Sequence, residues 1–134
     1  MDDILKQASK FVEPPQKEIE AVKNIAERSI DLVKKAAIKF DGIVGVEFGG
    51  SYAKKTWLNG DVDVDIFVKV KPDLSEQAFE KIGRELGSQA LRTYKPYLRY
   101  SQHPYVEAIV DGIRVNVVPC YNVERDKWII AADR

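Results

Sequence analysis

The sequence predicts an α+β domain, with helices packed mainly on one face of a mixed, mostly antiparallel sheet of about five strands. Three patterns carry this prediction. One long stretch has apolar residues at helical spacing, a central segment alternates aspartates with aliphatic residues, and a later segment has two alternating runs around an Asp-Gly pair. Since the chain has 134 residues, we expect a single domain over residues 1–134 with a core of its own.

The first helical pattern predicts a short helix over residues 2–11 and then a long one. Pro14 and Pro15 suit the first turn of the long helix, where a missing N–H costs nothing. The apolar stripe that should face the core consists of Ile19, Val22, Ala26, Ile30, Val33, Ala37 and Phe40. Asp41-Gly42 should end this helix and lead into a strand over residues 43–48.

A second helix is expected after the central strand. Asp73 is the predicted N-cap, because Glu76 follows three residues later as in a capping box. The apolar face of this helix comprises Phe79, Ile82, Leu86 and Ala90. Further on, alternating runs over residues 105–110 and 113–118 flank Asp111-Gly112, which is the strongest short-range signal for a β-hairpin.

The central strand carries the first functional signal. Three aspartates alternate there with aliphatic residues, in the order Asp61, Val62, Asp63, Val64, Asp65 and Ile66. Alternate residues of a strand share a face, so the carboxylates should project together while the aliphatic residues face the core. Two ionised carboxyls that converge to about 5 Å repel by roughly 3 kcal/mol at an effective dielectric near 20. A cation usually neutralises such a cluster beside a core.

We therefore interpret Asp63 and Asp65 as a platform for a divalent metal, with Asp61 as a flanking acid. The alternative is an ordinary strand with a solvated acidic face. An EF-hand is excluded, because its sixth position holds Ile66 instead of glycine and its twelfth holds Pro72 instead of glutamate.

A Gly49-Gly50-Ser51 turn precedes the acidic strand. Glycine lets the backbone approach a ligand closely, and unpaired N–H groups after such a turn can bind phosphate. The spacing matches neither a Walker loop nor a dinucleotide-binding fingerprint. Together, the turn and the strand suggest a triphosphate held by the turn and a metal held by the carboxylates.

These residues resemble a known family. Gly50-Ser51 followed, after eleven residues, by Asp63-Val64-Asp65 resembles the signature of polymerase-β-type nucleotidyltransferases. The runs GSYAKKTWLNG (50–60), VVPCY (117–121) and ADR (132–134) resemble the archaeal-type (class I) CCA-adding tRNA nucleotidyltransferases. The resemblance covers about residues 40–134, and it supports the α+β fold more strongly than periodicity does.

The resemblance implies transfer of CMP or AMP from CTP or ATP to the 3′ end of tRNA, with Mg²⁺ as cofactor. Asp63 and Asp65 would bind the metal ions, and Gly50 and Ser51 would bind the β,γ-phosphates. Lys54 stands where the family often has arginine, so it keeps the charge but loses bidentate binding. In the family, a helical neck and tRNA-binding domains follow, so we expect this chain to be the catalytic head, truncated before them.

The sequence departs from the family at Asn116, where the third metal-binding carboxylate is expected. An amide is neutral and cannot act as a base, so we expect the chain to be inactive as written. Asp111 cannot replace that acid, because an odd separation of five residues places it on the opposite face of the strand. The asparagine is either an engineered substitution, which we favour, or a naturally degenerate site. The rival interpretation is a minimal nucleotidyltransferase, or a pseudo-enzyme that acts as a nucleotide-binding or oligomer-forming module.

Composition limits the partners. With 21 basic and 21 acidic residues, the chain has no net attraction for nucleic acid, so RNA would have to meet a local patch or another part of the protein. Basic and aromatic residues interleave over residues 91–100, which suits either single-stranded nucleic acid or, as we favour, a strand with one wet face. His103 is expected to be a loop residue and not a ligand, because no cysteine or second histidine accompanies it.

The remaining expectations concern location and assembly. Cys120 is the single cysteine and can form no internal disulfide, which fits a reducing cytoplasm. No apolar run approaches the roughly 20 residues of a membrane span. A head without its neighbouring domains should expose an apolar patch, so we expect a possible dimer or higher assembly.

Overall fold

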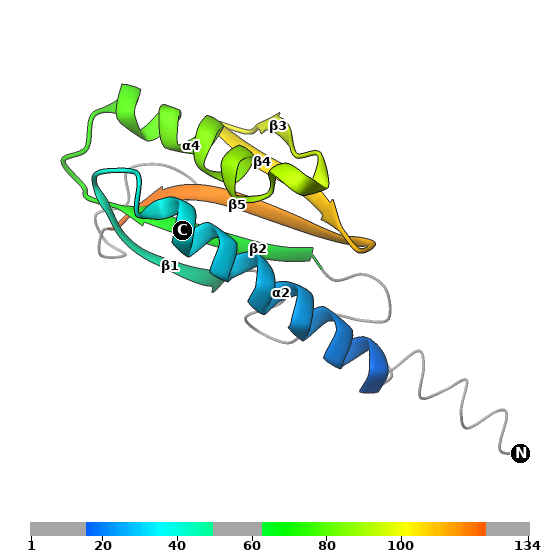
Figure 1. Cartoon of the computed structure of the whole chain (residues 1–134). Helices are drawn as coiled ribbons and strands as arrows, with labels where there is room; N and C mark the ends of the chain where they lie inside the picture. The colour runs from blue at the N-terminus through cyan, green and yellow to red at the C-terminus, as the bar shows by residue number, and fades with distance from the viewer. Residues whose placement is uncertain (1–15, 50–62, 123–134) are drawn as a thin grey trace, which may run out of the picture.

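In the computed structural model, which describes residues 16–49 and 63–122, two helices pack on one face of a five-stranded sheet (Figure 1). In chain order the elements are α2 (Gln16–Ala37), β1 (Ile43–Gly49), β2 (Asp63–Val70), α4 (Glu76–Ala90), the 3₁₀ turn η1 (Arg92–Tyr94), β3 (Tyr97–Tyr100), β4 (Pro104–Val110) and β5 (Ile113–Tyr121). The strand order is β1-β2-β5-β4-β3. Only β2 and β5 pair in parallel, so the predicted mixed, mostly antiparallel sheet is confirmed.

The core lies between the helices and the sheet. Along β2, each aliphatic residue is buried and each residue between is partly exposed, as the alternation predicted. The predicted stripe of α2 faces this core, with Val22, Ala26, Ile30 and Val33 buried. From α4, Phe79 contributes its whole ring to the core. Burying one such side chain is worth about 1.5–3 kcal/mol, so this layer supplies most of the stability.

The start of α4 corrects one prediction. Its N-cap is Ser75, whose hydroxyl accepts a hydrogen bond from the backbone N–H of Ala78 at 3.1 Å. Asp73 was the wrong choice, because it lies inside a turn closed by the hydrogen bond from the Leu74 N–H to the Lys71 carbonyl. An N-cap must directly precede the first helical residue to reach the unpaired N–H groups.

The predicted hairpin between β4 and β5 is confirmed. Asp111 and Gly112 form its turn with φ of 50° and 87°, the positive values that a two-residue hairpin turn requires. The Asp111 carboxylate lies 3.3 Å from Nη1 of Arg28 on α2, on the helical side of the sheet. Asp111 therefore lies away from Asn116, as the odd spacing predicted.

The interleaved segment over residues 91–100 is a strand only in its last part. Lys95 adopts the left-handed conformation with φ of 55°, which separates η1 from β3. β3 is an edge strand, and all four of its residues are exposed. No helix within residues 16–49 and 63–122 is long and apolar enough to cross a membrane.

Helix α4 comes unusually close to the start of β4. A Cβ added at Gly83 would lie 2.3 Å from the carbonyl oxygen of Pro104, so only glycine fits there. This approach fixes the end of the β3–β4 loop against the helix.

Gly83→Ala should therefore lower the free energy of unfolding by about 1–3 kcal/mol, because α4 must move off β4 to accommodate the methyl group. Gly45→Ala is the matched control, since nothing lies within 4 Å of a Cβ there. The control should change stability by less than about 0.5 kcal/mol. Urea denaturation measures both, and a Gly83→Ala variant as stable as the control would contradict the close approach.

Candidate nucleotide and metal site

A row of aligned residues crosses all five strands. Gly49 of β1 pairs with Asp65 of β2, which pairs with Asn116 of β5; Asn116 pairs with Glu107 of β4, and Glu107 with Tyr97 of β3. Residues paired in this way share a face, with neighbouring strands about 4.8 Å apart. Because the aliphatic residues of β2 point toward the helices, the row lies on the opposite face, here called the acidic face.

The centre of this row is a contact between Asp65 and Asn116. Nδ2 of Asn116 donates a hydrogen bond to Oδ1 of Asp65 at 2.9 Å. Within the described parts of the chain, the other amide atom, Oδ1 of Asn116, is buried and has no hydrogen-bond partner. The parallel pairing of β2 with β5 thus brings together two side chains that are 51 residues apart.

The environment of Asp65 disfavours its charge. Burial raises the pKa of this carboxyl above its ordinary value, and repulsion from Asp63 raises it further. The hydrogen bond from Asn116 acts in the opposite direction, because it stabilises the ionised form. A cation at this position would favour the charged form much more strongly.

Arg114 lies beside two further carboxylates of the acidic face. Its Nη1 lies 3.6 Å from Oδ2 of Asp63, and its Nε lies 3.5 Å from Oε1 of Glu107. Glu107 is almost fully buried and also accepts a hydrogen bond from the Tyr97 hydroxyl. That hydrogen bond raises the pKa of Tyr97, which therefore remains a donor. Arg114 of β5 thus lies between carboxylates on the two strands that flank β5, namely Asp63 of β2 and Glu107 of β4.

The predicted site residues fall into two groups. Asp63, Asp65 and Asn116 lie on one face, with Asp65 and Asn116 in contact. Gly50, Ser51 and Lys54 lie outside the described residues, as do the expected short helix and the final ADR run. Gly49, which directly precedes the predicted turn, is pressed against the Phe67 ring on the acidic face, where an added Cβ would lie 1.9 Å from a ring carbon.

Two residues of the acidic face were missed, Glu107 and Arg114. The hairpin could have revealed Glu107, because the turn makes Val110 pair with Ile113, and three further steps along each strand bring Glu107 opposite Asn116. No local pattern indicates Arg114, because its contact with Asp63 depends on the parallel pairing of β5 with β2.

Solved structures share this fold. The CdnC of E. coli MS115-1, in its complex with HORMA-deltaN, superposes with a TM-score of 0.63 at 18% identity, over 93% of this chain and 42% of that one. Cid1, whose structure is described in terms of RNA terminal uridylyl transferase activity, has a TM-score of 0.58 at 11% identity, over 82% of this chain and 33% of that one. The chain therefore shares the fold of these two proteins.

Sequence comparison defines the family. Residues 30–133 match the nucleotidyltransferase domain, and the chain belongs to this family. The CCA-adding enzyme of Archaeoglobus fulgidus is 34% identical over 138 residues, which cover 98% of this chain and 28% of that protein. The CCA-adding enzyme of Methanocaldococcus jannaschii is 33% identical over 135 residues, which cover 98% of this chain and 30% of that protein. The predicted resemblance to archaeal CCA-adding enzymes is confirmed, and the chain spans less than a third of the length of these relatives.

Asp65→Asn should stabilise the metal-free protein at neutral pH. The folded-state pKa of Asp65 is raised, so the folded protein keeps this proton to higher pH than the unfolded chain does. Ionisation of Asp65 therefore lowers stability as the pH rises through the folded-state pKa. Asparagine removes the charge and keeps an oxygen that accepts from Asn116. For a half-buried carboxyl, solvent screening limits the gain to about 0.5–1 kcal/mol.

The measurement is urea denaturation in EDTA across a pH series. The gain should shrink as the pH falls and disappear below about pH 3, where an ordinary aspartate is also protonated in the unfolded chain. Asp63→Asn is the control, because that carboxylate is about half exposed and faces Arg114, and it should bring no gain. A loss of stability in Asp65→Asn at neutral pH would contradict this account of the acidic face.

Proposed function

We propose that this chain is the catalytic head of a cytoplasmic nucleotidyltransferase that transfers CMP or AMP from CTP or ATP to the 3′ end of tRNA. The observation that carries the proposal is the contact between Asp65 and the side chain at position 116 on the acidic face. The CCA-adding relatives support tRNA as the acceptor. In the proposed reaction the 3′-oxygen bonds to the α-phosphorus, and the bond to the leaving pyrophosphate breaks.

The donor atoms on the acidic face suit Mg²⁺. This ion prefers oxygen ligands, and the carboxylates of Asp63 and Asp65 supply them. Oδ1 of Asn116 is a further oxygen, buried and without a hydrogen-bond partner among the described residues. Such an atom in a native protein calls for a ligand or water that satisfies it. We propose that Asp63 and Asp65 hold Mg²⁺, with the Asn116 oxygen as a weak neutral ligand.

When bound, two Mg²⁺ ions would lower the pKa of the attacking hydroxyl and offset the charge on the leaving pyrophosphate. The chain itself binds and orients. Asp63 and Asp65 would hold these ions beside the reacting α-phosphate, and Gly50 and Ser51 would bind the β,γ-phosphates, as a glycine turn can do through backbone N–H groups. Lys54 adds a positive charge beside those phosphates without the bidentate geometry of arginine.

The same site contains groups that compete with a cation. Arg114 lies beside Asp63, and the Asn116 amide already donates to Asp65. A metal must displace Arg114 from Asp63 and gains no third negative ligand at position 116. We propose that the chain is inactive as written for this reason.

These contacts also favour the second candidate, a nucleotide-binding module without turnover. Two large side chains of the edge strand β3, Leu98 and Tyr100, are 41% and 70% exposed and offer a surface for self-association. Nucleotide binding without incorporation, in both test proteins described next, would support this candidate.

Asn116→Asp should restore transfer in a chimera that joins this chain to the remainder of the A. fulgidus CCA-adding enzyme. Asparagine and aspartate have nearly the same size, so the variant changes one charge and leaves the strand intact. Losing a charged ligand worth about 3 kcal/mol slows a step roughly a hundredfold, so the matched chimera with Asn116 should be at least that much slower. Incorporation of radiolabelled CTP into tRNA lacking its CCA end measures both rates. Equal rates would show that position 116 is not the third metal ligand.

A further inference from the structure

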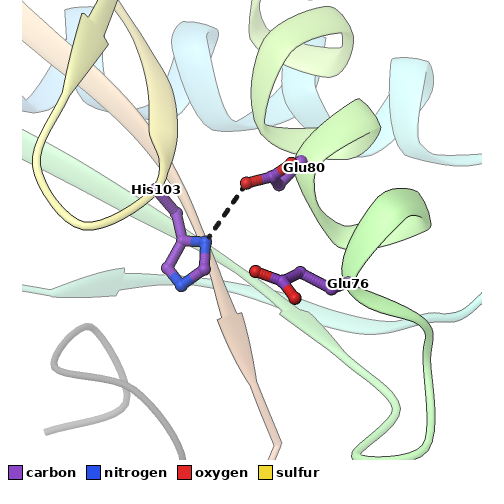
Figure 2. A group of neighbouring side chains, drawn as sticks. All are labelled: Glu76, Glu80 and His103. Atoms are coloured by element: carbon purple, nitrogen blue, oxygen red, sulfur yellow. Dashed lines mark ion pairs between the residues drawn. The ribbon is translucent and has the colours of Figure 1, made fainter.

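A second cluster of possible metal ligands lies on α4 and the loop between β3 and β4. Glu76 and Glu80 are one helical turn apart, so their carboxylates share one face of α4. Figure 2 shows the imidazole of His103, from the loop, beside both carboxylates. One oxygen of each glutamate and one nitrogen of the imidazole all lie within 4.8 Å of one another.

The imidazole of His103 is held in place by aromatic packing. It meets the Phe79 ring edge to face, with centroids 5.2 Å apart, and Phe79 in turn stacks on Tyr121 at 4.5 Å. Pro104, which directly follows His103, is pressed against Gly83 of α4. These contacts place His103 beside α4 in the structure without a bound ligand.

One nitrogen of this imidazole lacks a hydrogen-bond partner among the described residues. Nδ1 of His103 is buried and makes no hydrogen bond within residues 16–49 and 63–122. Its neighbour, Oε1 of Glu80, is 3.7 Å away, which is too long for a hydrogen bond. Two ligands bound at about 2.1 Å to one tetrahedral ion lie about 3.4 Å apart, so this separation is close to what an ion would set.

The Glu80 carboxylate lies near both Arg84 and His103. Its Oε2 is 4.0 Å from Nη1 of Arg84, an exposed pair one turn along the helix, while its Oε1 faces His103. Arg84 therefore lies beside one oxygen of Glu80, and the other oxygen faces the imidazole. Glu76 has no ion pair among the described residues and adds a second negative charge to the cluster.

We propose that Glu76, Glu80 and His103 form a binding site for a divalent cation of the zinc class, separate from the acidic face. One imidazole and two carboxylates suit Zn²⁺, and three protein ligands leave a position for water. Tyr121, which stacks on the Phe79 ring that contacts His103, lies five residues beyond Asn116 on β5, or about 17 Å along the strand. The bound ion would pin the β3–β4 loop to the first turns of α4.

The test uses the fact that His103 is the only histidine of the chain. Its imidazole resonances can be followed by NMR in the full chain, without assignment, while Zn²⁺ is added at pH 7. We expect these resonances to shift until one equivalent of Zn²⁺ has been added and then to stay constant. The same shift should occur in Asp65→Asn, because the two sites are independent.

Variants of the two glutamates distinguish a three-residue metal site from Zn²⁺ binding by His103 alone. Glu76→Gln and Glu80→Gln should each weaken the Zn²⁺ affinity at least tenfold. Glutamine has nearly the shape of glutamate, so each variant removes only the negative charge of one ligand. Glu85→Gln, on the same helix but outside the cluster, should bind Zn²⁺ as the unaltered chain does. The proposal is overturned if Zn²⁺ leaves the imidazole resonances unchanged. It is equally overturned if the Glu76→Gln/Glu80→Gln double variant responds to Zn²⁺ as the unaltered chain does.

Discussion

The parallel pairing of β2 with β5 is the interaction on which the rest of this structure depends. It aligns Asp65 with Asn116 and Asp63 with Arg114, so both contacts of the acidic face follow from one register. The same register sends Val64 and Val115 to the helical face, where both are fully buried. A slip of one residue would exchange the two faces and bury the carboxylates in the core, so core packing and site geometry specify the same alignment.

Within the acidic face, protein groups already do part of what a cation would do. Arg114 neutralises Asp63, and the Asn116 amide stabilises the charge on Asp65 against burial. An aspartate at position 116 could not donate to Asp65, and it would add a third charge to the cluster. Asn116 therefore favours a stable apo domain, whereas the carboxylate that the resemblance implies at this position would favour metal binding. Position 116 thus sets the stability of the apo domain against the negative charge available to a metal.

Local patterns in the sequence predicted most of the fold. The stripe of α2 as far as Val33, the alternation in β2 and the Asp111-Gly112 turn depend on neighbouring residues and were read correctly. The end of the helix was placed too late, because α2 ends at Ala37 and not at Asp41-Gly42. The prediction of Asp63, Asp65 and Asn116 as site residues came from the motif and its spacing. Arg114 was missed because its contact requires the pairing of strands far apart in sequence. His103 lies in a loop, as predicted, but its closeness to α4 depends on the contact of Gly83 with Pro104, which no periodicity reveals.

The most direct test of the account is the position of Mn²⁺, located by anomalous diffraction from crystals of the Asn116→Asp variant soaked with Mn²⁺ and a non-hydrolysable CTP analogue. The account predicts an anomalous peak within bonding distance of Asp63 and Asp65, on the face of the sheet opposite α2 and α4, with Arg114 moved away from Asp63. A nucleotide bound without Mn²⁺ at these carboxylates, or with Arg114 still paired to Asp63, would contradict it.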